Sequence, residues 1–270
     1  MHRCCLSAFA TLSLALGAPV LAQAQESDVD LAKKLANPVA SLISVPLQFN
    51  YDCCFGPSDG GRYTLNVQPV VPIALNDDWN VIIRTILPVI YQDRVAPSIG
   101  AAGGLGDTTQ SFFFSPKPTA SGLIWAIGPA FLWPTGEAEL GSKKWGAGPT
   151  ALLLKQQGAN TYGVLVNHIW SYADLGSNSH QDVSATFIQP FFSWTSPTAT
   201  TITINSESTY NWRDGQWSIP INMTVAHLYK FGAQRVSLGG AVRVYAARDA
   251  PPGQGPAWGL RFVATFLYPK

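Results

Sequence analysis

The chain has 270 residues, of which 47% are hydrophobic and only 12% are charged. The charged fraction is about half of the ~25% that is usual for soluble domains, and the chain contains 9 Trp, 9 Tyr and 13 Phe. This composition excludes a disordered polypeptide, and the formal net charge of +1 provides no basic surface for nucleic acid.

The N-terminus has the pattern of a secretory signal peptide. A positive charge at Arg3 precedes an apolar stretch from Cys4 to Ala22, and Ala22-Gln23-Ala24 matches a small-residue cleavage site. We therefore predict Sec-type export and removal of residues 1–24. A transmembrane anchor is the alternative interpretation. No later segment has the roughly 18 uninterrupted apolar residues of a membrane-spanning helix.

Residues 25–42 form a distinct segment before the first predicted strand. Their apolar residues recur at helical spacing, and Lys33 and Lys34 lie on the opposite face. We predict a short periplasmic helix that ends at Asn37-Pro38, because the residue before proline disfavours helical geometry. Such a helix could close the floor of the domain that follows; a loosely ordered leader is the alternative.

The cysteines that remain after signal cleavage, Cys53 and Cys54, are adjacent. No His or Cys lies near them in sequence, so no metal site is expected there. We interpret them as loop residues, with a strained bridge between them as the alternative.

Residues 43–270 divide into segments of about ten residues in which apolar and polar side chains alternate, as in half-buried strands. Gly, Pro and other turn residues separate the segments. The twelve predicted strands are Ser44–Tyr51, Arg62–Val71, Trp79–Gln92, Gly106–Ser115, Gly122–Trp133, Trp145–Lys155, Thr161–Tyr172, Asp182–Trp194, Thr201–Trp212, Gln216–Ala226, Arg235–Ala247 and Trp258–Tyr268.

The connections between these strands alternate between long and short, with one exception at Trp212–Gln216. An even strand count, alternating connections and a signal peptide are typical of a bacterial outer-membrane barrel. We therefore predict an all-β fold, a transmembrane antiparallel β-barrel of about 12 strands over residues 43–270, monomeric, with both termini in the periplasm. Ten or fourteen strands would fit if one segment is wrongly divided, and a secreted β-sandwich is the soluble alternative.

Aromatic residues lie near the ends of the predicted strands, where interfacial girdles occur in membrane barrels. They are Tyr51, Tyr63, Trp79, Tyr91, Trp133, Trp145, Tyr172, Trp194, Trp212, Trp217, Tyr245, Trp258 and Tyr268. The expected partners are outer-membrane lipid and, during insertion, the barrel-assembly machinery.

Several motifs resemble a known bacterial family. They are Asn37-Pro38-Val39-Ala40, residues 42–48, residues 65–72, residues 78–91, Gly104-Leu105-Gly106-Asp107, residues 144–149, Asn167-His168-Ile169-Trp170 and residues 265–270. Together they resemble the outer-membrane family named for the meta-cleavage pathway of phenol degradation. The resemblance implies an outer-membrane barrel and the passage of small, hydrophobic or aromatic compounds. Many outer-membrane barrels close on a terminal aromatic residue, whereas here Tyr268 is followed by Pro269 and Lys270.

Charged residues within the strands indicate which faces line the lumen, because a charge facing lipid at the midplane costs about 2–4 kcal/mol. On this basis Arg84, Lys155, Glu207, Arg235, Arg243 and Arg261 are expected to face inward. The predicted pore-lining residues are Gln48, Asn50, Asn66, Gln68, Arg84, Asn205, Glu207, Arg243 and Arg261. They would form either a constriction that filters solutes or a salt-bridge ladder that fills the barrel.

An apolar part of the lumen is expected from the same parity argument. If parity follows Arg84 and Gln110, then Ile86, Pro88 and Ile90 face inward together with Phe112 and Phe114. Such a lining would suit an apolar solute.

No enzymatic signature is expected to be functional. Gly56-Pro57-Ser58-Asp59-Gly60 matches the nucleophile elbow, but it lies between two strands and lacks the strand–turn–helix context. His168, His180 and His227 have no partners at metal-ligand spacing, so no metal and no cofactor is expected. We predict a non-enzymatic outer-membrane channel for small-molecule solutes. A structural barrel with a closed lumen and an outer-membrane acyl hydrolase with a Ser/His pair are the alternatives.

Overall fold

A computed structural model describes residues 27–96, 100–117, 121–137, 139–176, 181–248 and 255–268. The predicted signal peptide, His180, Pro269 and Lys270 lie outside these ranges. The elements are α1 (Asp28–Leu35), β1 (Ile43–Phe55), a 3-10 turn (Gly56–Ser58), β2 (Gly60–Val67), β3 (Val70–Ala74), β4 (Trp79–Asp93), β5 (Ala102–Leu105), β6 (Thr108–Pro116), β7 (Leu123–Trp133), β8 (Lys144–Gln157), β9 (Asn160–Asp174), β10 (Ser184–Thr195), β11 (Thr200–Ser206), β12 (Ser208–Asn211), β13 (Gln216–Phe231), β14 (Gln234–Ala247) and β15 (Trp258–Tyr268).

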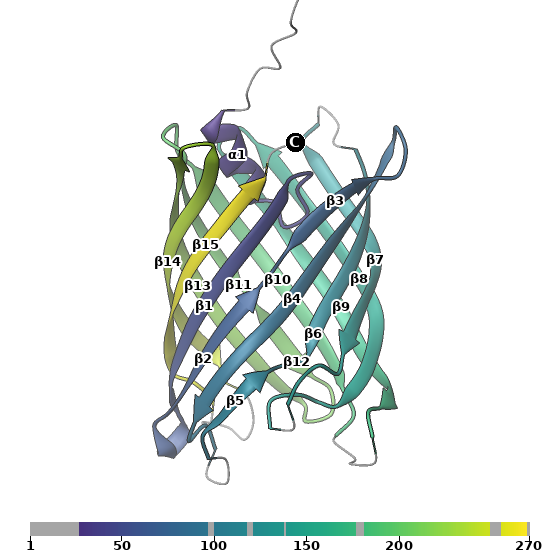
Figure 1. Ribbon diagram of the computed structural model, residues 1–270, viewed down its shortest axis with the longest axis vertical. Helices are drawn as coiled ribbons and strands as arrows, with labels where there is room; N and C mark the ends of the chain where they lie inside the picture. The colour runs from purple at the N-terminus through teal and green to yellow at the C-terminus, as the bar shows by residue number, and fades with distance from the viewer. Residues whose placement is uncertain are drawn as a thin grey trace, which may run out of the picture.

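The strands form one closed antiparallel barrel (Figure 1). Each strand pairs with its neighbours in chain order, and β15 closes the barrel on β1 from Ile43↔Tyr268 to Cys53↔Trp258. Three positions in the wall are each occupied by two successive segments. These pairs are β2 with β3, β5 with β6, and β11 with β12. The closed barrel therefore has 12 strand positions, as predicted. No helix in the described ranges is long and apolar enough to cross a membrane.

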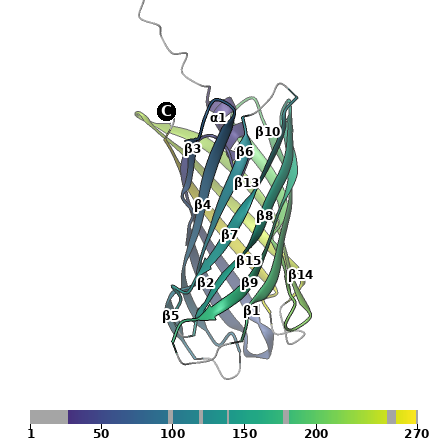
Figure 2. The ribbon, with the colours of Figure 1, turned by 90° about the vertical axis from the view of Figure 1, so that its right-hand side faces the viewer.

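The two ends of the barrel differ (Figures 1 and 2). Helix α1 and the end of β15 lie at one end, which we call the helix end, together with tight turns such as Ser196–Ala199. The longer connections, such as the one between β7 and β8, lie at the opposite loop end. The alternation of short and long connections read from the sequence corresponds to these two ends.

The outer surface is an apolar belt between two groups of exposed aromatic side chains. Tyr63, Tyr91, Trp170, Tyr172, Trp212, Trp217 and Trp258 lie toward the loop end, and Trp125, Tyr162, Trp194, Tyr229 and Tyr268 toward the helix end. Strand β15 joins the two groups with 11 residues, about 33 Å along the strand. At the strand tilt of outer-membrane barrels this is about 25 Å along the axis, the height of their apolar band.

Helix α1 packs onto the helix end of the barrel. The side chain of Ser27 caps its first turn by accepting a hydrogen bond from the Asp30 amide, and Lys33 and Lys34 complement its last turn. Its buried residues Leu31 and Ala32 belong to a cluster that also contains Ala40, Leu42, Ala199, Leu228 and Leu267. The predicted helix is present, and its apolar face is ordered by contacts with the barrel rather than left as a loose leader.

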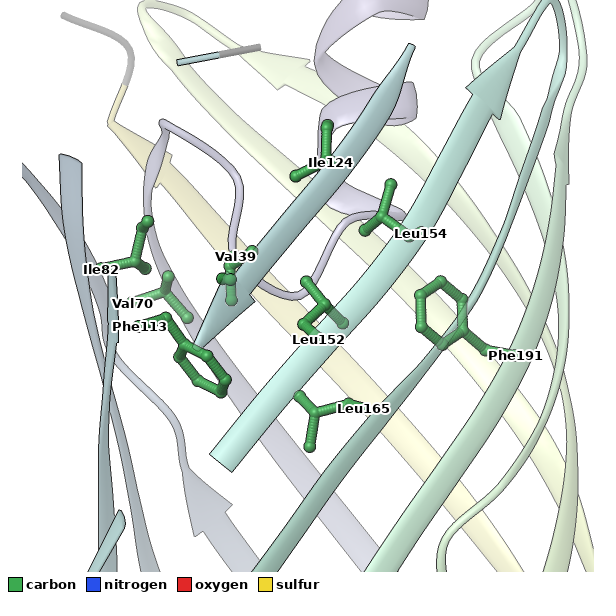
Figure 3. Packing of buried hydrophobic residues seen from close by; sticks show 10 residues of the cluster. Val39, Val70, Ile82, Phe113, Ile124, Leu152, Leu154, Leu165 and Phe191 are labelled. Atoms are coloured by element: carbon green, nitrogen blue, oxygen red, sulfur yellow. The ribbon is translucent and has the colours of Figure 1, made fainter. Parts of the chain in front are cut away.

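A second apolar cluster lies inside the barrel (Figure 3). This apolar cluster consists of Val39, Val70, Ile82, Phe113, Ile124, Ala126, Leu152, Leu154, Leu165 and Phe191. Most of its members come from neighbouring strands on one side of the barrel, β3 to β10, and Val39 comes from the segment after α1. Of the three consecutive phenylalanines of β6, Phe113 faces inward and is fully buried, whereas Phe114 is exposed on the outer face. The expectation that Phe112 and Phe114 line the lumen is therefore wrong.

Candidate functional site

Two cavities lie one after the other inside the barrel. The loop-end cavity has a volume of about 290 Å³ and is lined mainly by polar and charged side chains of β1, β2, β14 and β15. The helix-end cavity, about 240 Å³, is lined by the N-terminal segment and by small and polar side chains of the wall. Gln48 lines both cavities, which places their junction near the middle of β1.

An ion pair lines the loop-end cavity. Arg261 on β15 donates two hydrogen bonds to the Glu207 carboxylate, Nη1 to Oε1 at 2.9 Å and Nη2 to Oε2 at 2.6 Å. Its Nε donates to Asn50 Oδ1 at 2.7 Å. Such two-pronged geometry is the strongest arrangement of a guanidinium with a carboxylate, and it fixes both side chains in place.

Arg243 extends this group along β14. Its Nη1 donates to Asn50 Oδ1 at 2.8 Å, and its Nη2 donates to the Tyr245 hydroxyl at 2.9 Å. Tyr245 in turn donates to Asp52 Oδ1 at 2.7 Å. The Arg243 Nε lies 3.1 Å from the same carboxylate oxygen, off the line of its N–H, so this contact is an ion pair rather than a hydrogen bond.

These contacts join six residues, which we call the charged cluster: Asn50, Asp52, Glu207, Arg243, Tyr245 and Arg261. Its residues come from four places in the barrel wall. Alternation along β1 brings Asn50 and Asp52 to the inner face, and alternation along β14 does the same for Arg243 and Tyr245. Glu207 lies in the break between β11 and β12, where its amide bonds to the Pro220 carbonyl at 3.2 Å. The cluster therefore depends on closure of the barrel as well as on strand parity.

Arg84 on β4 is separated from β15 along the barrel wall by β1 and by the position that β2 and β3 share. It donates to Gln68 Oε1 at 3.2 Å and lines the helix-end cavity. It also lines a third cavity of about 140 Å³, together with Ile86, Ile169 and Phe187. The guanidinium thus lies where the polar part of the lumen meets its apolar wall.

The structure brings some of the residues predicted to line the pore together and leaves others apart. Asn50, Glu207, Arg243 and Arg261 belong to the charged cluster. Gln48, Asn66, Gln68 and Arg84 line the cavities, and Arg84 bonds to Gln68. Asn205 shares the inner face of β11 with Thr201 and Thr203 and pairs with Asn222 on β13. Within the described residues, no side-chain hydrogen bond joins Gln48, Asn66 or Asn205 to the cluster.

Two members of the charged cluster were missed at the sequence level. Asp52 follows Asn50 by two residues on β1, and Tyr245 follows Arg243 by two residues on β14, so the same parity rule would have found both. Tyr245 was instead expected in an aromatic girdle. Its hydroxyl bonds to Asp52 and Arg243 in the lumen, so this expectation is wrong.

The remaining strand charges divide between the two faces. Arg235 faces inward, is buried and bonds through Nε to Asp28 of α1 at 2.7 Å. Lys155 shares the outer face of β8 with the exposed Leu153, so the expectation that it faces the lumen is wrong. Lys155 pairs with Tyr162 close to the helix-end turn, where a charge at the membrane boundary costs much less than at the midplane.

The segment between α1 and β1 narrows the helix end. Ala36, Asn37, Pro38 and Ala40 all line the helix-end cavity. Val39 packs into the apolar cluster, and its amide is held by Asn37 Oδ1 at 3.0 Å. A solute that leaves the helix-end cavity along the barrel axis must pass this segment.

The loop end is tied together by ionic contacts. Lys144 at the start of β8 forms ion pairs with Asp174 and Asp182. The Lys144 ammonium holds the pKa of the Asp182 carboxyl below its usual range, by hydrogen bonding and by charge. Cys53 and Cys54 form a disulfide at the end of β1, so they are bonded to each other rather than being free loop residues.

Groups that could support catalysis or metal binding are sparse in the described part of the chain. Ser58 ends the 3-10 turn between β1 and β2. The Nδ1 atoms of His168 and His227 lie 2.6 Å from Thr186 Oγ1 and 2.8 Å from Thr200 Oγ1. No carboxylate in the described ranges hydrogen-bonds either imidazole, and no group of three or more His, Cys, Asp or Glu residues there could hold a metal ion.

Comparison with known proteins identifies similar folds rather than close relatives. The structure resembles the crystal structure of an outer membrane channel from Pseudomonas putida F1, with a TM-score of 0.65 and 14% identity over 84% of this chain and 96% of that one. It also resembles the NanC porin (TM-score 0.49, 9% identity, 83% of this chain and 98% of that one) and outer membrane phospholipase A from Escherichia coli (0.47, 8%, 83% and 90%). No protein-family model and no curated protein sequence matches the chain.

Proposed function

We propose that this protein is an outer-membrane channel through which small molecules pass down their own gradients. In this proposal the loop end faces the outside, and α1 and both termini face the periplasm. The observation that carries the proposal is the combination of an apolar outer belt with a lumen that holds successive cavities. A barrel that is lipid-compatible outside and polar inside is the architecture of outer-membrane channels.

The lumen supports a filter for small solutes. The Arg261–Glu207 pair lines the loop-end cavity, and the segment that contains Asn37 and Val39 narrows the helix end. Twelve strands lie between the eight-stranded barrels that side chains fill and the 16–18 strands of open porins. The passing solute would therefore be small, and movement of these groups would set its size limit.

The solute class follows from the two faces of the lumen. Arg84 and the charged cluster offer polar contacts, and Ile86, Phe187 and the apolar cluster offer a hydrophobic surface. We propose small, partly apolar organic molecules, which agrees with the resemblance to the family named for phenol degradation. The protein acts without catalysis in this proposal.

Flux measurements on reconstituted protein test this function. Purified, folded protein in phospholipid vesicles would be offered a panel from small sugars to small aromatic compounds, with heat-denatured protein as the control. We expect solute-dependent flux that falls steeply with solute size. The absence of flux for every solute in folded protein would contradict a channel and favour a structural barrel. The Arg261–Glu207 ion pair would then stabilise the fold rather than filter solutes.

A further inference from the structure

Arg84 differs from the arginines of β14 and β15 in lacking a bonded carboxylate. Arg235, Arg243 and Arg261 each form an ion pair with an Asp or Glu. Within the described residues, no ion pair joins Arg84 to any carboxylate, and its side-chain hydrogen bond goes to the neutral Gln68 amide at 3.2 Å. A guanidinium has five N–H donors, so most of the donors of this partly buried cation are not used by the protein.

The nearest relevant carboxylate is already bonded elsewhere. The charge of Glu207 acts on Arg84, but both Glu207 oxygens accept hydrogen bonds from Arg261, at 2.9 Å and 2.6 Å. Glu207 Oε2 also lies 3.9 Å from Arg243 Nη1. One carboxylate therefore faces three guanidinium groups, and Arg84 is the one that it does not bind.

The inner cavities carry more positive than negative charge. The loop-end cavity, the helix-end cavity and the third cavity of about 140 Å³ are lined together by four arginines and two carboxylates: Arg62, Arg84, Arg243, Arg261, Asp52 and Glu207. Asp107 and Glu139 line a further cavity nearer the loop end, so the positive balance begins below it. A cleft with such a balance concentrates anions.

The third cavity, which we call the Arg84 cavity, has an apolar part and a polar part. Ile86, Ile169 and Phe187 supply its apolar surface. Thr109, Ser111 and Asn167 supply hydroxyl and amide groups beside Arg84. A cavity of about 150 Å³ accommodates one benzene ring, so a volume of about 140 Å³ suits a small ring or a short branched chain.

We propose that the Arg84 cavity binds a small organic carboxylate, with its carboxylate on the Arg84 guanidinium and its apolar body against Ile86, Ile169 and Phe187. The planar fork of a guanidinium matches the two oxygens of a carboxylate, and the ligand supplies the counter-charge that the protein does not. The proposal rests on the proposed channel function and narrows its solutes to organic anions.

The position of Arg84 places this site on the passage. Arg84 lines the helix-end cavity as well as the Arg84 cavity, so a carboxylate bound there remains in contact with the route toward the helix end. A neutral solute of the same shape would fill the apolar part and leave the guanidinium without a counter-ion. An ammonium solute would meet a like charge.

Benzoate and benzamide test the site because they have nearly the same shape and differ in charge. Titration calorimetry on folded protein in a neutral detergent measures binding of each compound. We expect wild-type protein to bind benzoate at least about tenfold more tightly than benzamide, as befits a charge-assisted, two-pronged contact. Equal affinities for the two compounds would overturn the proposal.

Substitution of Arg84 identifies the group responsible. Arg84→Met should remove the preference for benzoate and leave benzamide binding within about twofold of wild type. Arg62→Met, which alters an arginine of the loop-end cavity, is the matched control and should retain the preference. Arg84→Lys keeps the charge but not the fork, so its benzoate affinity should fall severalfold; it also serves if Arg84→Met does not fold. A preference that persists in both Arg84 variants would contradict the site.

The apolar part of the site has its own variant. Phe187→Ala removes one wall of the Arg84 cavity, so the affinities for benzoate and benzamide should fall together, severalfold, with their ratio unchanged. Wild-type affinity for both compounds in this variant would show that the ring does not lie against Phe187.

Flux separates the site from the channel. In protein-containing vesicles, benzoate should enter faster than benzamide through wild-type protein, and Arg84→Met should remove that difference. Wild-type protein that binds benzoate with the predicted preference but carries neither compound would contradict the channel proposal and support the binding site. Flux without any preference in binding or in rate would support the channel and contradict the site.

Discussion

The two walls of the lumen are built on different principles. On one side, strands β3 to β10 contribute the apolar cluster, whose side chains are chemically alike and fill space. On the other side, β1, β14, β15 and the break between β11 and β12 contribute the charged cluster, whose members are joined by specific hydrogen bonds. An apolar wall tolerates replacement by similar volumes, whereas a buried ionic group depends on each partner. The difference predicts which substitutions should alter stability, conduction or both.

Removal of Arg261 should have the largest effect. The variant Arg261→Met leaves Glu207 partly buried without its two-pronged partner, and breaking such a pair costs about 3–5 kcal/mol. We expect a fall in the free energy of unfolding of about 3 kcal/mol, because Glu207 retains some solvent access. Urea unfolding in lipid vesicles measures the change, and Lys155→Met on the outer face is the control.

The ionic origin of this effect can be separated from packing. In Glu207→Leu/Arg261→Met protein neither member of the pair is charged, so most of the lost stability should return. If the double variant is as unstable as Arg261→Met alone, the interaction between these two side chains does not explain the loss.

On the opposite wall, Phe113→Ala should destabilise the barrel by a similar or slightly smaller amount. Phe113 is fully buried in the apolar cluster, and truncation of a buried phenylalanine costs about 3 kcal/mol or more. Phe114→Ala, the next residue on the same strand, faces outward and should cost much less. Equal losses for the two variants would contradict the inward orientation of Phe113.

Deletion of residues 25–41 should enlarge the helix end of the passage. The segment lines the helix-end cavity and places Val39 within the apolar cluster. We expect the conductance to rise at least about twofold, because the narrowest part of a pore dominates its resistance. Planar-bilayer recordings measure this rise. A deletion variant that folds and conducts like wild type would show that the segment does not obstruct the passage.

The smallest effect is expected from Asp28→Asn, which weakens the attachment of α1. The Asp28 carboxylate is partly exposed, so its ion pair with Arg235 is worth about 0.5 kcal/mol. Current recordings should show more frequent fluctuations with little change in mean conductance. Asp30→Asn, which alters the helix cap without touching Arg235, provides the comparison.

The strands and the inner face of β1 could be predicted from the sequence because a strand has a period of two. Gln48 and Asn50 alternate with apolar residues, so their face is defined. The same rule failed at Phe112 and Phe114, because three consecutive phenylalanines obscure the alternation and Gln110, which set the expected parity, shares their outer face. The interruption of β11 and β12 at Glu207 was also not predicted.

Contacts across the lumen could not be predicted from the sequence at all. Arg261 and Asn50 are 211 residues apart and meet only when β15 has closed on β1. The position of Val39 within the apolar cluster likewise depends on how the chain enters the barrel. Parity therefore predicts which residues face the lumen, and barrel closure decides which of them meet.

Single-channel recording from the wild-type protein in planar bilayers tests the central claim most directly. The account predicts discrete current steps of reproducible size from folded protein, because a closed barrel with cavities along its axis provides a passage for ions. Folded protein that inserts into the bilayer but produces no current steps in any salt would contradict the channel. It would show that the side chains of the two walls close the lumen.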